Sequence, residues 1–217
     1  MSKYSRRPSS TSTGMTSLPR RDLEIIAEMI DDGCRVLDVG CGNGALLDYL
    51  GRYKGVDGRG IELGQTGVNA CVANGLSVIQ GDADTDLEYY PDDAFDYVVL
   101  TRTLQATRNP RDVVLHLVRI GRHAIVSFSN FGHWRVRLEM LFDGCMPVVG
   151  DEGASWYNTS NIHLCTIRDF LVLCDDLDLK VQRALSLSRY GSARKLNSGA
   201  AAANIRAEEA IFVLTRE

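Results

Sequence analysis

The sequence predicts an α/β fold in three layers, with a mostly parallel sheet of seven strands that carries an antiparallel edge strand. Predicted strands and helices alternate from residue 34 to about 130, which is typical of parallel strands joined by right-handed crossovers. The last two predicted strands come without a helix of normal length between them, and such a pair can place an antiparallel strand at the edge. The chain has 217 residues, 45% of them apolar, which suits one domain with a substantial core.

Hydrophobic spacing predicts the elements in order. Leu23, Ile26 and Ala27 share one helical face, which predicts an opening helix over residues 22–29. Five strands are then expected, at 35–40 (RVLDVG), 58–63 (GRGIEL), 76–81 (LSVIQG), 95–100 and 123–130 (HAIVSFSN). The helices between them are NGALLDYL, QTGVNACVANG and NPRDVVLHLVRIG. Gly75 suits the end of the second of these helices, and Pro110 the first turn of the third.

The second half of the chain is less regular. After an irregular stretch we expect a helix at IRDFLVLCDDLD, a sixth strand at LKVQRALSLS and a last strand at EEAIFVLTR. Residues 189–207 are small and polar, which favours a loop. Residues 1–19 are polar and basic, rich in Ser, Thr and Pro, and we expect a flexible tail there. The folded domain would then span residues 20–217.

Composition excludes several classes of protein. The net charge of −4 makes nonspecific nucleic-acid binding improbable, because such binding relies on Lys and Arg neutralising phosphates. No apolar run approaches the roughly 20 residues of a membrane helix, and the first residues show no secretory signal. None of the six cysteines forms a C-x-x-C pair, which favours buried, reduced thiols in a cytoplasmic protein. No His, Cys and Asp cluster has metal-ligand spacing, so no metal is expected.

The stretch VLDVGCGNG, residues 36–44, predicts a ligand-binding turn. It follows the first strand and precedes a helix, the place where doubly wound sheets bind ligands. Gly40 and Gly42 can adopt backbone angles closed to other residues and let the chain approach a ligand. Taken alone the glycines are a weak signal, since they also match the dinucleotide pattern G-x-G-x-x-G/A loosely.

Three carboxylates at successive strand ends decide between the possible ligands. Asp38 lies two residues before Gly40, where it would repel a pyrophosphate and attract an ammonium or sulfonium group. Glu62, about twenty residues further on, suits ribose hydroxyls. Asp82 can accept a hydrogen bond from an exocyclic amine such as that of adenine. Together they predict a pocket for S-adenosylmethionine, the alternative being that each acid merely caps the following helix.

A family resemblance supports this interpretation. VLDVGCGNG, GIEL, GDAD and FDYVVL, in this order and spacing, resemble the S-adenosylmethionine-dependent methyltransferases with the Rossmann-like fold. LTRTLQATRNP, SFSNFGHWRVRLEMLFDGCMPV, WYNTSNIHLCTIRDF and AEEAIFVL resemble the methionine-biosynthesis protein MetW family over residues 20–217. The second likeness is the more specific, because the glycine motifs are shared by a very large superfamily.

The resemblance implies a three-layer Rossmann-like methyltransferase fold that binds S-adenosylmethionine or S-adenosylhomocysteine. It also implies a role in methionine biosynthesis beside a homoserine O-acyltransferase of the α/β-hydrolase type. It does not by itself imply methyl transfer. The expected cofactor-binding residues follow the glycine turn and the next three strand ends: Asp38, Gly40, Cys41, Gly42, Gly44, Glu62, Leu63, Asp82, Ala83 and Thr101.

A catalytic group is harder to assign. Where many amine methyltransferases carry an Asn/Asp-Pro-Pro-aromatic turn, this chain has Thr101-Arg102-Thr103-Leu104. Arg102 could bind a carboxylate ligand or partner, or could be a solvated loop residue. A methyltransferase acting on an unknown small molecule or protein remains the alternative function. A nicotinamide oxidoreductase is disfavoured by Asp38 and by the pair Asp82 and Asp84.

The segment at about 131–165 is the other concentration of chemically capable residues. In this fold such an insertion lies over the ligand cleft, so we expect a lid that also offers a surface to a partner. Its aromatic and charged residues are those enriched at interfaces, and its histidines could instead act as bases. These residues are His133, Trp134, Arg135, Arg137, Trp156, Tyr157 and His163.

Overall fold

The computed structural model describes residues 18, 20–150, 153–188, 191–196 and 200–216. The predicted tail therefore lies outside the described residues, apart from Leu18, which is buried against the opening helix. One sheet of eight strands forms the centre, in the order β3-β2-β1-β4-β5-β8-β6-β7. Strands β1 to β5 pair in parallel, and β8 runs antiparallel to both of its neighbours. The predicted α/β class is confirmed.

The first half alternates strand and helix as the spacing predicts. Its elements are α1 (Arg21–Met29), β1 (Arg35–Val39), α2 (Ala45–Lys54), β2 (Asp57–Glu62), α3 (Gln65–Ala73), β3 (Val78–Gln80), η1 (Leu87–Tyr89), β4 (Phe95–Thr101), η2 (Leu104–Ala106), α4 (Pro110–Ile120) and β5 (Gly121–Ser129). Pro110 opens α4, where its missing N–H costs nothing. Gly75 follows α3 with a φ of +74°, a conformation that suits a helix end.

The second half contains two helices and one strand that the sequence did not predict. The elements are α5 (Trp134–Asp143), α6 (Ile167–Asp176), β6 (Leu179–Leu187), β7 (Ala193–Lys195), α7 (Ala200–Arg206) and β8 (Glu209–Arg216). Helix α5 lies in the stretch expected to be irregular, and β7 and α7 lie in the expected loop 189–207. The expected count of seven strands was therefore one too low. The antiparallel edge strand is β7, while β8 inserts between β5 and β6.

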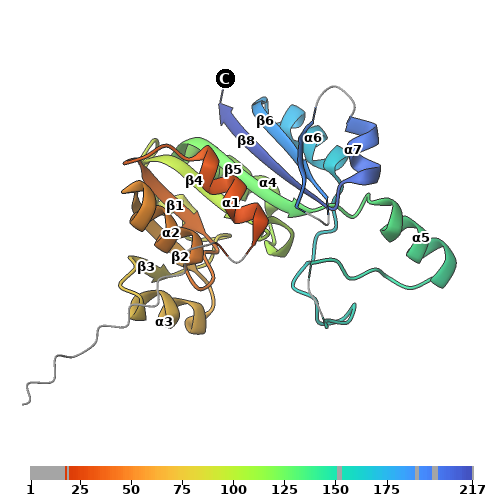
Figure 1. Ribbon diagram of the computed structural model, residues 1–217, viewed down its shortest axis with the longest axis horizontal. Helices are drawn as coiled ribbons and strands as arrows, with labels where there is room; N and C mark the ends of the chain where they lie inside the picture. The colour runs from red at the N-terminus through yellow and green to blue at the C-terminus, as the bar shows by residue number, and fades with distance from the viewer. Residues whose placement is uncertain (1–17, 19, 151–152, 189–190, 197–199, 217) are drawn as a thin grey trace, which may run out of the picture.

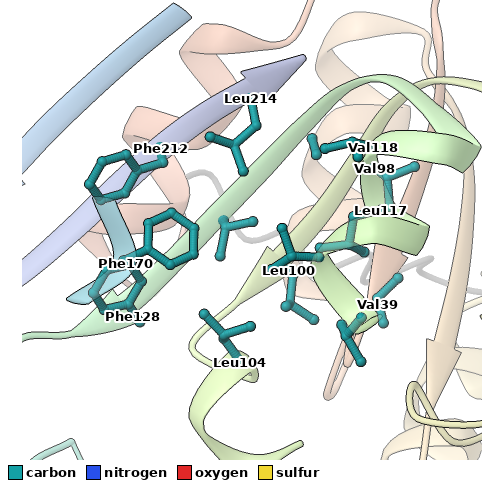
Figure 2. Packing of buried hydrophobic residues seen from close by; sticks show 14 of the residues in the cluster. Val39, Val98, Leu100, Leu104, Leu117, Val118, Phe128, Phe170, Phe212 and Leu214 are labelled. Carbon is teal, nitrogen blue, oxygen red and sulfur yellow. The ribbon is translucent and has the colours of Figure 1, made fainter. Parts of the chain in front are cut away.

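Two hydrophobic layers cover the two faces of the sheet. One face packs on α4 and α6, and the other packs on α1 and α2. Figure 2 shows the first layer, in which Phe128 of β5, Phe170 of α6 and Phe212 of β8 meet. The ring centroid of Phe170 lies 4.8 Å from the centroid of Phe128 and 4.8 Å from that of Phe212. These contacts hold the antiparallel strand against the parallel part of the sheet.

The strand order reverses at β1, because β2 lies on one side of β1 and β4 on the other. In doubly wound sheets ligands bind at the carboxyl ends of the strands at such a reversal. The glycine turn follows β1 directly at this point. No helix in the described part of the chain is long and apolar enough to span a bilayer.

Candidate functional site

The glycine turn uses its three glycines in two different ways. Gly40, Gly42 and Gly44 have φ values of +71°, +58° and +78°, which L side chains rarely adopt. A Cβ at Gly40 would lie 2.5 Å from Oγ1 of Thr103, and one at Gly44 would lie 2.3 Å from Cδ1 of Leu76. A Cβ at Gly42 would meet nothing within 4 Å. Two glycines thus allow close packing, and the third leaves open space at the tip of the turn.

Asp38 carries a buried carboxyl group on β1, next to the glycine turn. It lies on β1 between β2 and β4 and is 2% exposed. Its Oδ1 is fully buried and accepts no hydrogen bond from the described residues. The pKa of this carboxyl is raised to about 7: burial is the largest cause, Arg20 opposes it, and Glu62 adds to it. An unpaired buried carboxyl is costly, so a cation at this point would be strongly attracted.

Glu62 is held in place by the glycine turn itself. It ends β2, and its Oε2 accepts a hydrogen bond from the Gly42 N–H at 2.8 Å. Its Oε1 accepts one from the Gly64 N–H at 2.7 Å. Each carboxylate oxygen has lone pairs for a second donor. The structure thus brings Glu62 against the glycine turn, with both carboxylate oxygens held by backbone N–H groups.

Asp82 forms an ion pair with Arg108, which the sequence did not predict. Its Oδ2 lies 2.6 Å from an Nη2 donor of Arg108, and its Oδ1 accepts from the Asp84 N–H at 2.9 Å. Arg108 also approaches Asp84, with 3.5 Å between Nε and Oδ2. Arg108 is separated from Asp82 by 26 residues, so local pattern gave no sign of the pair. Asp82 can serve a ligand amine only with the lone pairs that Arg108 leaves.

The other expected site residues lie around these acids. Leu63, next to Glu62, is 65% exposed, which leaves an apolar surface beside the turn. Cys41 is 8% exposed, and burial raises the pKa of its thiol far above its usual range. Thr101 ends β4, and its carbonyl accepts the Thr103 hydroxyl at 3.0 Å. Ala83 packs partly against the α4 side of the core.

Arg102 belongs to a partly buried ion-pair network with two acids, and neither expectation for it included this. Its Nε and Nη2 donate to the two carboxylate oxygens of Glu209 at 2.9 and 2.7 Å. Its Nε also lies 3.5 Å from Oδ2 of Asp22. Arg20 donates hydrogen bonds from Nε and Nη2 to the two carboxylate oxygens of Asp22. Arg102 has a φ of +54°, a conformation that non-glycine residues keep only when their surroundings impose it. Glu209 lies 107 residues away, beyond the reach of a local pattern.

Comparison with known proteins settles the family. The family model described as methionine biosynthesis protein MetW matches residues 20–214. The chain belongs to the MetW family. A bifunctional methionine biosynthesis protein MetXA/MetW from Rhodopirellula baltica is 36% identical over 169 residues, covering 74% of this chain and 27% of that protein. This MetW-family chain thus spans about a quarter of that relative's length.

Solved structures confirm the fold of this MetW-family chain. A SAM-dependent methyltransferase from Thermotoga maritima matches with a TM-score of 0.66 at 13% identity, covering 91% of this chain and 88% of that one. A TehB-like SAM-dependent methyltransferase from Corynebacterium glutamicum matches with a TM-score of 0.59 at 19% identity, covering 92% and 89%. At such identities the likeness shows the Rossmann-like methyltransferase fold and no more.

The two histidines of the MetW-family insertion lie in different surroundings. His133 is 5% exposed and precedes α5 without a side-chain hydrogen bond to the helix, and burial lowers the pKa of its ring. His163 Nε2 lies 3.1 Å from the backbone oxygen of Arg108. A carbonyl only accepts, so Nε2 carries the proton in this contact. No cluster of three or more possible metal ligands occurs among the described residues.

The insertion is fastened at its two ends. Asn130, fully buried, donates to the carbonyls of Asn204 and Ala207 at 2.9 and 2.7 Å. The returning segment donates the N–H groups of Ile162 and His163 to the carbonyl of Gln105. Arg137, expected as a surface anchor, donates to the Gly132 carbonyl at 2.6 Å and so closes the turn before α5.

Helix α5 itself buries no residue and stands apart from the sheet (Figure 1). Its apolar side chains recur at the spacing i, i+4, i+7 and i+8, which places them on one helical face. We call this set the α5 stripe: Trp134, Leu138, Leu141 and Phe142, which are 44%, 39%, 72% and 77% exposed. Exposed apolar faces of this kind are found on surfaces that contact proteins or membranes.

Proposed function

We propose that this protein binds S-adenosylmethionine or S-adenosylhomocysteine at the glycine turn. The observation that carries the proposal is the buried, unpartnered carboxylate of Asp38, which the ammonium group of the ligand's methionine part would neutralise. Glu62, already oriented by Gly42 and Gly64, would accept the ribose hydroxyls. The exposed Leu63 would lie against the adenine ring, and Asp82 would accept the adenine amine.

We further propose that the protein acts in methionine biosynthesis as an accessory or regulatory partner of homoserine O-acyltransferase. The bifunctional MetXA/MetW relative supports this, because it joins MetW in one chain with MetXA, the homoserine acyltransferase. Since S-adenosylmethionine is made from methionine, its binding would report the output of the pathway to the enzyme that feeds it. Such coupling is reciprocal, so the partner should change the affinity for the adenosyl ligand by the same factor.

The α5 stripe is the surface we assign to this partner. An exposed apolar helix face fits an apolar groove on another protein, with anchors about one and two turns apart. The stripe is joined to the carboxyl edge of the sheet through the fastened ends of the insertion. Val149 and Gly150 of the same insertion line a cavity there together with Arg102. A contact at the stripe could therefore be transmitted to the ligand end of the sheet.

The experiment is binding of a purified homoserine O-acyltransferase to the purified protein, with and without S-adenosylhomocysteine. Phe142→Ser should weaken the complex and leave ligand binding and stability almost unchanged, because Phe142 is 77% exposed. Tyr89→Ser is the matched control, since Tyr89 is 78% exposed on η1, and it should have no effect. If no complex forms and the isolated protein turns over S-adenosylmethionine with an acceptor, the methyltransferase alternative replaces this proposal.

A further inference from the structure

A cavity of about 320 Å³ lies at the carboxyl edge of the sheet, beside the adenosyl site but with a different lining. Arg20, Arg102, Ser129 and Val149 contribute to its wall. None of the residues assigned to the adenosyl ligand lines it. Its volume is at the lower end of the range for small-molecule sites, which is about 300–1,000 Å³. The cavity is therefore the size of a compact metabolite.

The charged lining of this cavity consists of three arginines and three acids: Arg20, Arg21, Arg102, Asp22, Glu208 and Glu209. Glu208 is half-buried, whereas the side chains of Asp22 and Glu209 are only 1% and 10% exposed. The side chains of Arg20 and Arg102 are 36% and 35% exposed. A ligand would thus touch guanidinium groups, whose paired acids lie behind them. The buried acids hold the arginines in position, as a supporting layer does in a preorganised site.

Among the described residues, each arginine uses only two of its three guanidinium nitrogens as hydrogen-bond donors. Arg20 uses Nε and Nη2 for Asp22, and Arg102 uses Nε and Nη2 for Glu209. Within the part of the chain that the structure describes, neither Nη1 makes a hydrogen bond. A guanidinium has five N–H donors and no acceptor, so the remaining donors suit an anion. Arg102 also keeps a φ of +54°, a strained conformation of the kind that clusters at ligand-binding sites.

We propose that this cavity is a second ligand site, which takes a small organic carboxylate between Nη1 of Arg20 and Nη1 of Arg102. The two groups act as a fork on the carboxylate oxygens, and the hydroxyl of Ser129 is available in the same wall. The proposal does not depend on adenosyl binding, because the two sets of lining residues do not overlap.

The test is titration of the purified full chain with butyrate, followed by calorimetry at constant ionic strength maintained with sodium chloride. Butyrate should bind, and n-butylamine, which has the same carbon chain and the opposite charge, should not. Arg20→Gln should weaken butyrate binding about tenfold or more, the loss expected for a charge-assisted hydrogen bond. Arg111→Gln is the matched control, since Arg111 is 62% exposed on α4 outside the cavity, and it should change nothing.

A second variant protects the test against misfolding of Arg20→Gln. Val149→Phe places a ring in the cavity without altering any charge, and it should also abolish butyrate binding. Protein saturated with S-adenosylhomocysteine should still bind butyrate. The proposal is overturned if butyrate and butylamine bind alike, if both variants bind butyrate as the wild type does, or if S-adenosylhomocysteine displaces butyrate competitively.

Discussion

Replacing Asp38 by Asn should stabilise the protein without ligand and weaken the binding of the adenosyl ligand. The Asp38 carboxyl is buried and its Oδ1 has no partner among the described residues, which raises its pKa from 3.8 to about 7. At about 1.36 kcal/mol per pKa unit, this rise corresponds to about 4 kcal/mol of lost stability once the group is ionised in the folded state. The side chain is wholly buried, so solvent screening does not reduce this figure.

The stability difference between the wild type and Asp38→Asn should depend on pH. Between the ordinary pKa and the raised one, the unfolded chain releases a proton that the folded chain keeps. The stability contributed by this group therefore falls as pH rises from 3.8 to about 7 and is constant above that. Asp38→Asn removes this dependence, so the variant should be more stable than the wild type by about 4 kcal/mol at pH 8 and by little near pH 4.

Ligand binding should change in the opposite direction. A bound ammonium group favours the ionised carboxyl, so wild-type affinity should rise as the pH is raised from 6 to 8, and the Asn variant should bind weakly throughout. Urea unfolding at several pH values and calorimetry with S-adenosylhomocysteine measure the two effects. Parallel stability profiles for the wild type and the variant, or equal ligand affinities, would refute the argument from the unpaired carboxylate.

Three further substitutions test separate parts of the account. Glu62→Ala should weaken S-adenosylhomocysteine binding by about 1.5–3 kcal/mol in calorimetry, and unchanged affinity would remove Glu62 from the site. Arg102→Ala should lower the free energy of unfolding by about 2–3 kcal/mol, less than for a fully buried pair because Arg102 is a third exposed. That loss should shrink in acid, where Glu209 is neutral, and a loss independent of pH would contradict the ion pair. Thr166→Ala removes the capping box of α6 and should cost about 1 kcal/mol, a fall of about 2–4 °C in Tm; an unchanged Tm would show that the cap contributes nothing.

The sequence predicted the parts of the fold whose signals are local. The alternation of short apolar strands and helices up to β5 reflects burial on both faces, and it located each strand and α-helix there to within a few residues, though not η1 or η2. Helix α5 was missed although its stripe has helical spacing. Val136 and Met140 lie on other faces of the helix, and the helix packs against nothing that would sharpen its pattern. Strand β7 is three residues long, too short for an alternating pattern.

In the candidate site, too, the residues with local signals were predicted and those that depend on distant segments were not. The glycine turn and the acids at the ends of β1, β2 and β3 are read from their positions relative to the strands. The partners of those acids come from distant segments, as with Arg108 for Asp82 and Glu209 for Arg102. Such pairs depend on the order of strands in the sheet, and the insertion of β8 beside β5 leaves no mark in the local pattern. The sequence therefore predicted the residues of the candidate site but not the ion pairs that surround them.

The most direct test of the account is the choice of ligand by the purified protein. At a ligand concentration about 100 times Kd, binding should add about 2.7 kcal/mol to the free energy of unfolding and raise the melting temperature. We expect this shift with S-adenosylhomocysteine and none with NAD at the same concentration. A shift with NAD and none with either adenosyl compound would contradict the assignment of Asp38, Glu62 and Asp82 to an adenosyl site.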